Sequence, residues 1–227
     1  FESYKGDMEE FLAEALSKMN KMDDESLKKM AEDFSSAMKL SYDLFGKHSF
    51  RKSLSKDNGD DSRSVLNISL FDAIASQLAL NHHFLRGLSP SLIKERICRL
   101  MEYSKFLSAI SYSTNNTIEA KARHRLAHKI LSTDGSVSVN EIIYSDIVEE
   151  YFKSANKSVT KDEVLNISND FHSEIEDAKK LTDWAVKQDI QDDIYFKLVL
   201  ALEPYGWSDA LQEPLIVELI QQAKELN

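Results

Sequence analysis

Five side chains that can bind phosphate or exchange protons lie close together in one stretch of the sequence: Lys121, Arg123, His124, Arg125 and His128. A guanidinium binds phosphate oxygens and an imidazole exchanges a proton near neutral pH, so this combination could bind or cleave a phosphodiester. On an ideal helix with about 100° per residue, Arg123 lies on the apolar side, whereas the other four form a polar, basic face. Because a buried guanidinium keeps its charge, we expect Arg123 to point toward the core and to have a carboxylate or several carbonyl groups as partners.

Three interpretations of this segment are open. In the first, the basic face is simply exposed to water and Arg123 is a structurally paired arginine, as is usual for charged helix faces. In the second, the basic helices within 90–131 contact phosphate or nucleic acid through Arg96, Arg99, Lys121, Arg125 and Lys129. In the third, the chain is a ribonuclease of the HEPN class, whose motif is an arginine followed after four to six residues by a histidine. Arg123 and His128 have that spacing, although they lie about 140° apart on an ideal helix.

No other set of side chains predicts a catalytic centre. His124 and His128 lie one helical turn apart, but the glutamate that zinc proteases carry between such histidines is missing. The sequence has no glycine-rich phosphate loop and no nucleophile elbow. The single cysteine, Cys98, falls in a segment rich in core positions, where an inert buried thiol is expected. We therefore predict no metal and no cofactor.

The composition favours helices. The 227 residues include 6 glycines and 3 prolines, 42% are hydrophobic, and strand-like alternation of β-branched residues is scarce. No apolar run approaches the roughly 20 residues that span a bilayer. A lone cysteine cannot form an internal disulfide, which is typical of a reducing compartment. We expect an all-α, cytoplasmic protein with no membrane contact.

Apolar residues that recur at intervals of three and four predict a bundle of seven to nine helices. The expected ranges are 8–19, 25–45, 67–87, 90–107, 116–133, 140–152, 160–184, 189–202 and a last helix from Pro214. Within the second range, five apolar side chains are expected to face the core: Leu27, Met30, Phe34, Met38 and Leu44. Gly46 should end this helix, and residues 47–64 should form a solvated loop.

Charge predicts two sub-bundles. The net formal charge is −10, but residues 86–131 carry nine bases and three acids, whereas residues 132–227 carry eight bases and twenty acids. We place the boundary near Asp134-Gly135, which gives a helical region at 1–133 and an acidic helical region at 134–227.

Two motifs flank the predicted loop: Phe45-Gly46-Lys47-His48-Ser49-Phe50-Arg51-Lys52 and Asn67-Ile68-Ser69-Leu70-Phe71-Asp72. They resemble the helical C-terminal portion of GmrSD-like bacterial proteins, which typically read Phe-Gly-x-x-Ala-Phe-Arg, a variable loop and Asn-x-x-Leu-Phe-Glu. The opening Phe1-Glu2-Ser3-Tyr4 looks like the start of that portion. Arg123 falls where these proteins often carry an arginine followed by an aromatic residue, here replaced by His124. The resemblance covers roughly residues 1–131.

The resemblance implies a part of a phage-defence or type IV restriction protein. In that family an N-terminal domain with a ParB/sulfiredoxin-like fold uses nucleotide hydrolysis, and its glutamine-arginine motif is absent here. We therefore expect a non-catalytic helical scaffold, a fragment or tail of a larger protein. Its partner would be the missing ParB-like domain or a partner subunit, with DNA or RNA contact through 90–131. The alternatives are the HEPN-like ribonuclease and an acidic bundle that binds a basic protein.

The motif residues themselves are expected to be structural. Phe45, Phe50 and Phe71 are large apolar residues that could fix both ends of the loop to the core. Arg51 could pair with an acid such as Asp72 and fix the angle between the two flanking helices.

Overall fold

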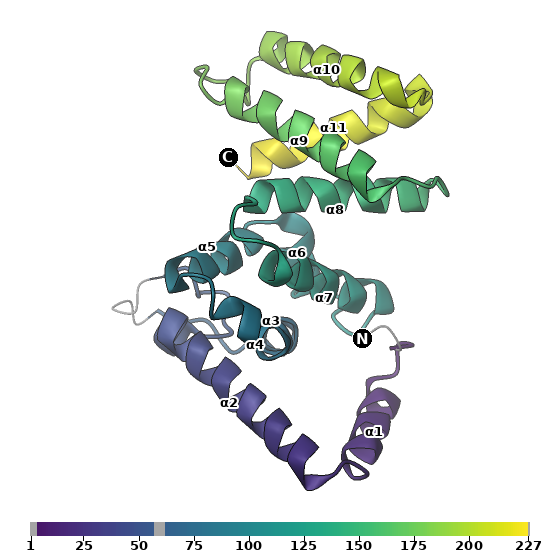
Figure 1. Ribbon diagram of the computed structural model, residues 1–227. Coiled ribbons are helices and arrows are strands. Elements are labelled where there is room, and N and C mark those ends of the chain that lie inside the picture. The colour runs from purple at the N-terminus through teal and green to yellow at the C-terminus, as the bar shows by residue number, and fades with distance from the viewer. Residues whose placement is uncertain (1–3, 57–61, 227) are drawn as a thin grey trace. The chain divides into compact units, whose positions relative to one another are not determined.

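The computed structural model describes residues 4–56 and 62–226, and it divides the chain into two compact units, Phe1–Gly135 and Ser136–Asn227. Both units are built from α-helices, so the predicted all-α bundle is confirmed (Figure 1). The described residues form eleven α-helices, more than the seven to nine expected. Within the same residues, no helix combines the length and the apolar character needed to cross a bilayer.

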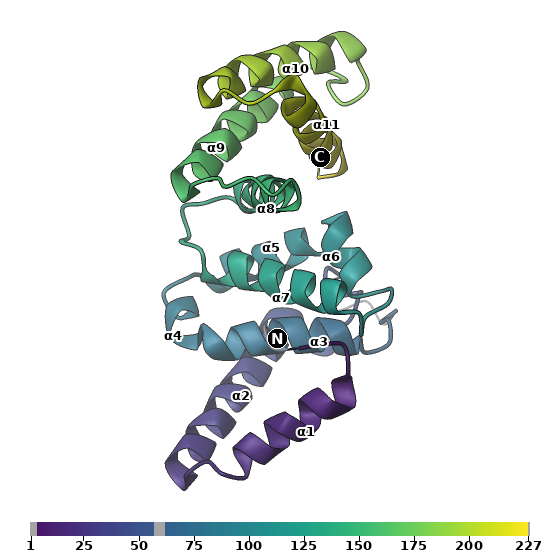
Figure 2. The ribbon, with the colours of Figure 1, turned by 90° about the vertical axis from the view of Figure 1, so that its right-hand side faces the viewer.

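The described residues of unit 1 form seven α-helices and one 3₁₀ turn. They are α1 (Met8–Met19), α2 (Asp24–Phe45), η1 (Gly46–His48), α3 (Ile68–Leu80), α4 (His82–Leu85), α5 (Pro90–Leu100), α6 (Ser104–Ala109) and α7 (Thr117–Ser132). Helix α3 packs between α2 and α7, and α5 and α6 both pack on α7 (Figure 2). The core side chains of α3 include Leu70, Ile74 and Leu78, all of which are buried.

Short polar side chains begin most of these helices. Asp7, Asp23, Asn67 and Ser89 each accept a hydrogen bond from a backbone N–H in the first turn of the helix that follows. These bonds satisfy amides that have no partner inside the helix, and they fix the starts of α3 and α5 close to the predicted starts at residues 67 and 90.

Unit 2 is a bundle of four α-helices. They are α8 (Val139–Ser154), α9 (Lys161–Ala178), α10 (Gln188–Leu202) and α11 (Asp209–Glu225), with a 3₁₀ turn, η2 (Glu203–Tyr205), before the last. Each helix packs on the next along the chain, and α11 returns to pack on α8. Two capping boxes start α8 and α9, one formed by Ser138 with Glu141 and one by Thr160 with Glu163.

Several predicted boundaries were wrong. The helix expected over 67–87 ends at Leu80, and α4 follows after Asn81; the helix expected over 90–107 ends at Leu100, and α6 begins at Ser104. Apolar periodicity continues across both breaks, so it could not reveal them. Helix α9 ends at Ala178 rather than near Trp184. Helix α11 begins at Asp209, so that Pro214 lies inside it.

The segment expected to be a solvated loop is partly buried. His48, Phe50, Ser53 and Leu54 are all buried, and the His48 Nδ1 atom lies 2.9 Å from the Ser53 hydroxyl. The segment therefore packs as part of unit 1 up to that point. The acidic centre of the predicted loop, residues 57–61, lies outside the described residues, as do residues 1–3 of the proposed family start.

The N-terminal arm, residues 7–34, differs most from expectation. Helix α1 buries none of its residues, and the expected core side chains Met30 and Phe34 of α2 are 39% and 51% exposed. Tyr4, just before the arm, is buried and its hydroxyl donates a hydrogen bond to the Asn115 carbonyl oxygen at 2.7 Å. The amphipathic pattern correctly predicted both helices of the arm, but not that these apolar positions remain at the surface.

Candidate functional site

A polar cluster lies where α3 meets α7. The Asp72 carboxylate oxygen Oδ2 is 3.3 Å from Arg123 Nη2 and 2.9 Å from His124 Nε2. Arg123 also donates from Nη1 to the Thr114 carbonyl oxygen at 2.6 Å. The Arg123 side chain is 2% exposed, so a carboxylate and a carbonyl group stabilise a buried charge, as predicted from the helical wheel.

His128 has a different partner on α3. Its Nδ1 atom lies 3.0 Å from the Gln77 side-chain oxygen, which also accepts a hydrogen bond from Asn81. Gln77 is five residues beyond Asp72 on α3, just as His128 is five residues beyond Arg123 on α7, so the two helices run parallel. Arg123 and His128 thus hold separate points of the α3–α7 contact, one buried and one at the surface.

Arg96 is not available to bind a nucleic acid, and its selection as a nucleic-acid contact was wrong. Its side chain is buried, and it donates to the carbonyl oxygens of Ile130, Thr133 and Asp134 at 3.1, 2.6 and 2.6 Å. Burial lowers the pKa of the Arg96 guanidinium from its ordinary value, and the nearby Asp134 opposes that shift. Arg96 lies one turn from the core residues Ile93 and Leu100 of α5, a signal in the sequence that could have predicted its burial.

The other basic candidates differ in exposure. Lys121 is exposed on α7. Arg99 is exposed on α5 and pairs with Glu102 at 2.9 Å. Arg125 and Lys129 are half-buried along α7. The predicted basic face of α7 is therefore narrower than the wheel suggested, because His124 packs against Asp72 and Arg125 is half-buried, which leaves Lys121 and His128 as its exposed members.

The motif residues connect α2 to α3. Phe45 and Phe50 are buried, and the Phe50 and Phe71 rings meet edge to face with centroids 5.0 Å apart. Gly46 ends α2 with φ 52° and ψ −129°, a conformation that residues with a Cβ rarely adopt. These positions therefore shape the turn between the two helices.

Two further motif side chains hold this connection in place. Asn67 accepts a hydrogen bond from the Leu70 amide and donates one to the Ile110 carbonyl oxygen after α6. Arg51 donates to the Ser64 carbonyl oxygen, so the expected pairing of Arg51 with Asp72 is replaced by one across the connecting segment. Asp72 pairs with Arg123 and His124 of α7 instead.

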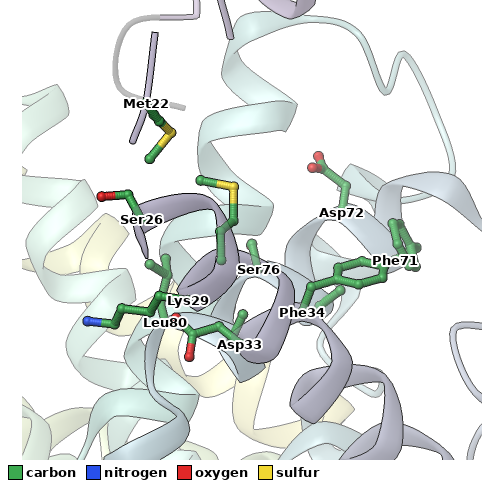
Figure 3. A pocket seen from close by; sticks show the side chains of 12 residues that line it. Met22, Ser26, Lys29, Asp33, Phe34, Phe71, Asp72, Ser76 and Leu80 are labelled. Atoms are coloured by element: carbon green, nitrogen blue, oxygen red, sulfur yellow. The ribbon is translucent and has the colours of Figure 1, made fainter. Parts of the chain in front are cut away.

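An apolar groove of about 540 Å³ lies between α2 and α3, and sequence analysis did not predict it (Figure 3). We call it the α2–α3 groove and define it by its lining residues: Met22, Ser26, Lys29, Met30, Asp33, Phe34, Phe71, Asp72, Ala75, Ser76, Ala79 and Leu80. Figure 3 shows Met22 at one end and Phe71 at the other. Two of its apolar residues, Met30 and Phe34, were assigned to the core, because periodicity identifies an apolar face but not whether that face is covered.

Within residues 4–56 and 62–226, no group of three or more histidine, cysteine, aspartate and glutamate side chains is placed to hold a metal ion. Cys98 is half-buried, and burial raises the pKa of its thiol. Comparisons with protein-family models, with curated proteins and with solved structures find no match to this chain.

Proposed function

We propose that this chain is a non-catalytic helical scaffold of a GmrSD-like defence protein, which positions a ParB-like domain or a partner subunit. The observation that carries the proposal is the role of Arg123. Its guanidinium is enclosed between the Asp72 carboxylate and the Thr114 carbonyl oxygen, where it holds α3 against α7. The pairing of its charge inside the protein supports a structural role for Arg123, rather than the binding of a substrate phosphate.

The motif residues that resemble the family support the same role. Gly46, Phe50 and Asn67 shape the connection between α2 and α3 through a positive φ angle, an aromatic contact and a double hydrogen bond. Each of these three positions needs its residue type because of the fold, and no bound substrate is required to explain it.

The scaffold contacts nucleic acid, in this proposal, through the exposed part of the basic surface. Lys121 of α7 and Arg99 of α5 are exposed cations, and Arg125 and Lys129 are half-buried along α7. A small cationic surface on an acidic protein predicts weak binding that falls steeply with salt, because each phosphate contact releases counterions.

The test is to incubate the purified chain separately with labelled RNA, labelled DNA, ATP and GTP in the presence of Mg²⁺. We expect no hydrolysis of any of them. Cleavage of RNA that is lost in His128→Ala, and retained in the control Lys180→Ala on the surface of unit 2, would refute the scaffold and establish the ribonuclease alternative.

Nucleic-acid contact has its own measurement. Fluorescence anisotropy with a labelled oligonucleotide should detect binding at 50 mM salt that weakens strongly by 200 mM. The double variant Lys121→Ala/Arg125→Ala should reduce it, and a control at Lys180 of unit 2, which is exposed and pairs only locally with Asp177, should not.

A further inference from the structure

The N-terminal arm carries apolar side chains in the pattern of a core, yet they remain in solvent. In α1, Leu12 and Leu16 are 52% and 59% exposed; in α2, Met30 and Phe34 are 39% and 51% exposed. Each pair is spaced by four residues and therefore lies on one side of its helix. Burying a side chain of this size gains about 1.5–3 kcal/mol, so an exposed apolar pair on each of two successive helices marks a surface that another molecule covers.

The α2–α3 groove has the shape that accepts a helix. The groove residues of α3 recur as adjacent pairs four positions apart, so they lie along one face of the helix. Ala75 and Ala79 have small side chains, which leave space in the middle of that face. Met22 and Met30 contribute flexible side chains at the α2 side of the groove, which can adapt to a partner's shape. Two neighbouring helices with small residues between them leave a trough into which the side-chain ridge of a third helix packs.

Charge indicates which kind of helix. Residues 7–34 carry nine acidic and four basic side chains, a net charge of −5. Within the groove, Lys29 and Asp33 offset each other, and Asp72 is paired with Arg123. The excess negative charge is therefore carried by residues outside the groove lining, and residues 22–34, which form the α2 side of the groove, hold five acidic and two basic side chains. A second copy of this chain would bring a second arm of net charge −5 against the first, whereas a cationic partner is attracted.

We propose that the α2–α3 groove, with the apolar side of α1 next to it in the chain, is the docking site for a basic amphipathic helix of a partner protein. The partner helix buries its apolar stripe against Met30, Phe34 and Ala75, and its lysine or arginine residues face the acidic side chains of residues 22–34. This is the helix-in-groove mode of recognition. It deepens the scaffold role proposed above by naming the chemistry of the partner, and it rests on that role.

The test uses three fluorescein-labelled 18-residue peptides and the whole chain. The first peptide has leucines on one helical face and lysines elsewhere, the second has the same leucines with glutamates, and the third has the lysines with serines in place of the leucines. Fluorescence anisotropy should show binding of the first peptide at least tenfold tighter than that of either of the others. Equal binding of the first and second peptides would contradict the charge argument. Equal binding of the first and third would contradict apolar docking in the groove.

Matched variants locate the binding. Met30→Ser/Phe34→Ser should weaken binding of the leucine–lysine peptide at least tenfold, whereas Phe196→Ser/Leu200→Ser, an equally spaced exposed pair on α10, should leave it unchanged. Both variants change exposed side chains, and an unchanged melting temperature confirms that they fold. Equal effects of the two variants would overturn the proposal.

Sedimentation of the chain alone distinguishes the other occupant. A concentration-dependent dimer that Met30→Ser/Phe34→Ser dissociates would show that a second copy fills the groove, and the proposal would fail. A failure in either experiment leaves the hydrolysis and oligonucleotide assays of the scaffold role unaffected, so the two proposals can be rejected separately.

Discussion

The Asp72 carboxylate lies 3.3 Å from the Arg123 guanidinium across the contact between α3 and α7. The arginine is 2% exposed and the aspartate 32% exposed, so one charge is enclosed while its partner still reaches solvent. Asp72 therefore provides the counter-charge that makes burial of Arg123 tolerable, and it also lines the α2–α3 groove. The same carboxylate links the stability of unit 1 to the surface proposed to bind a partner.

Removing this carboxylate should destabilise unit 1 strongly. Asp72→Ala removes the carboxylate that pairs with the buried Arg123 charge, and we expect a loss of about 3 kcal/mol in the free energy of unfolding. Asp72→Asn should cost less, because the amide oxygen still accepts a hydrogen bond. Urea unfolding followed by circular dichroism measures both. Asp33→Ala, which changes another groove carboxylate, is the control; a loss for Asp72→Ala no larger than the control's would contradict the role of the ion pair.

Arg96 should matter for the end of α7 rather than for binding. Arg96→Ala removes the donor for three carbonyl groups near the C-terminus of α7, where a cation also interacts favourably with the helix dipole. We expect a loss of about 2–4 kcal/mol. Arg96→Lys should recover only a small part of it, because a single ammonium group cannot reproduce the planar fork of donors.

Arg99→Ala is the matched control, three residues further along α5. Its side chain is exposed and pairs with Glu102, an interaction worth about 1 kcal/mol or less. Oligonucleotide affinity should depend on Arg99 and not on Arg96. We expect weaker binding for Arg99→Ala and unchanged binding for Arg96→Lys, provided that this variant is folded. A similar loss of stability for the two alanine variants would contradict the capping role.

Helix positions could be predicted from the sequence, and their environment only in part. The wheel placed Arg123 correctly on the buried side of its helix, because burial of α7 depends on the apolar residues around it. It could not supply Asp72 as the partner, since the two residues are 51 positions apart and only the packing of α3 on α7 brings them together. The pairing of Arg51 with Asp72 was wrong for the same reason.

The apolar arm shows the complementary limit. Met30 and Phe34 have the spacing of core residues, and that spacing would be the same whether the covering surface belongs to this chain or to another molecule. Arg96 shows that a charged residue at a core position carries information, since its place in the stripe of Ile93 and Leu100 marks a buried guanidinium with carbonyl partners. Counting the nine basic residues of 86–131 concealed the burial of Arg96, because such a count treats every cation as exposed.

The Cys98 thiol should react slowly with alkylating reagents. Burial raises its pKa, so the reactive thiolate is scarcer at neutral pH than for a free cysteine, and the half-buried side chain limits access. We expect labelling by iodoacetamide at pH 7.5 at least tenfold slower in the folded protein than in 6 M guanidinium chloride. The unfolded protein serves as the control, and equal rates in the two states would show that the thiol is open and reactive.

Tyr144 should make the protein sensitive to alkali. Its ring packs edge to face on Phe171, its hydroxyl has no hydrogen-bond partner among the described residues, and desolvation, with a smaller contribution from Glu176, raises the pKa of the phenol well above its ordinary value near 10. Below pH 10 the phenol is neutral in both states, and its ionisation does not affect stability.

Above pH 10 the unfolded chain releases this proton and the folded chain keeps it. The free energy of unfolding should therefore fall by up to about 1.4 kcal/mol per pH unit from this residue alone. Tyr144→Phe removes the effect, and at pH 8 it should be neutral or stabilise by about 1 kcal/mol, because no hydrogen bond is lost. Urea unfolding at pH 8, 10 and 11 measures the difference between wild type and variant, which should widen with pH. Tyr112→Phe, at a residue 73% exposed, is the control, and a Tyr144→Phe difference that stays constant with pH would refute the burial of a neutral phenol.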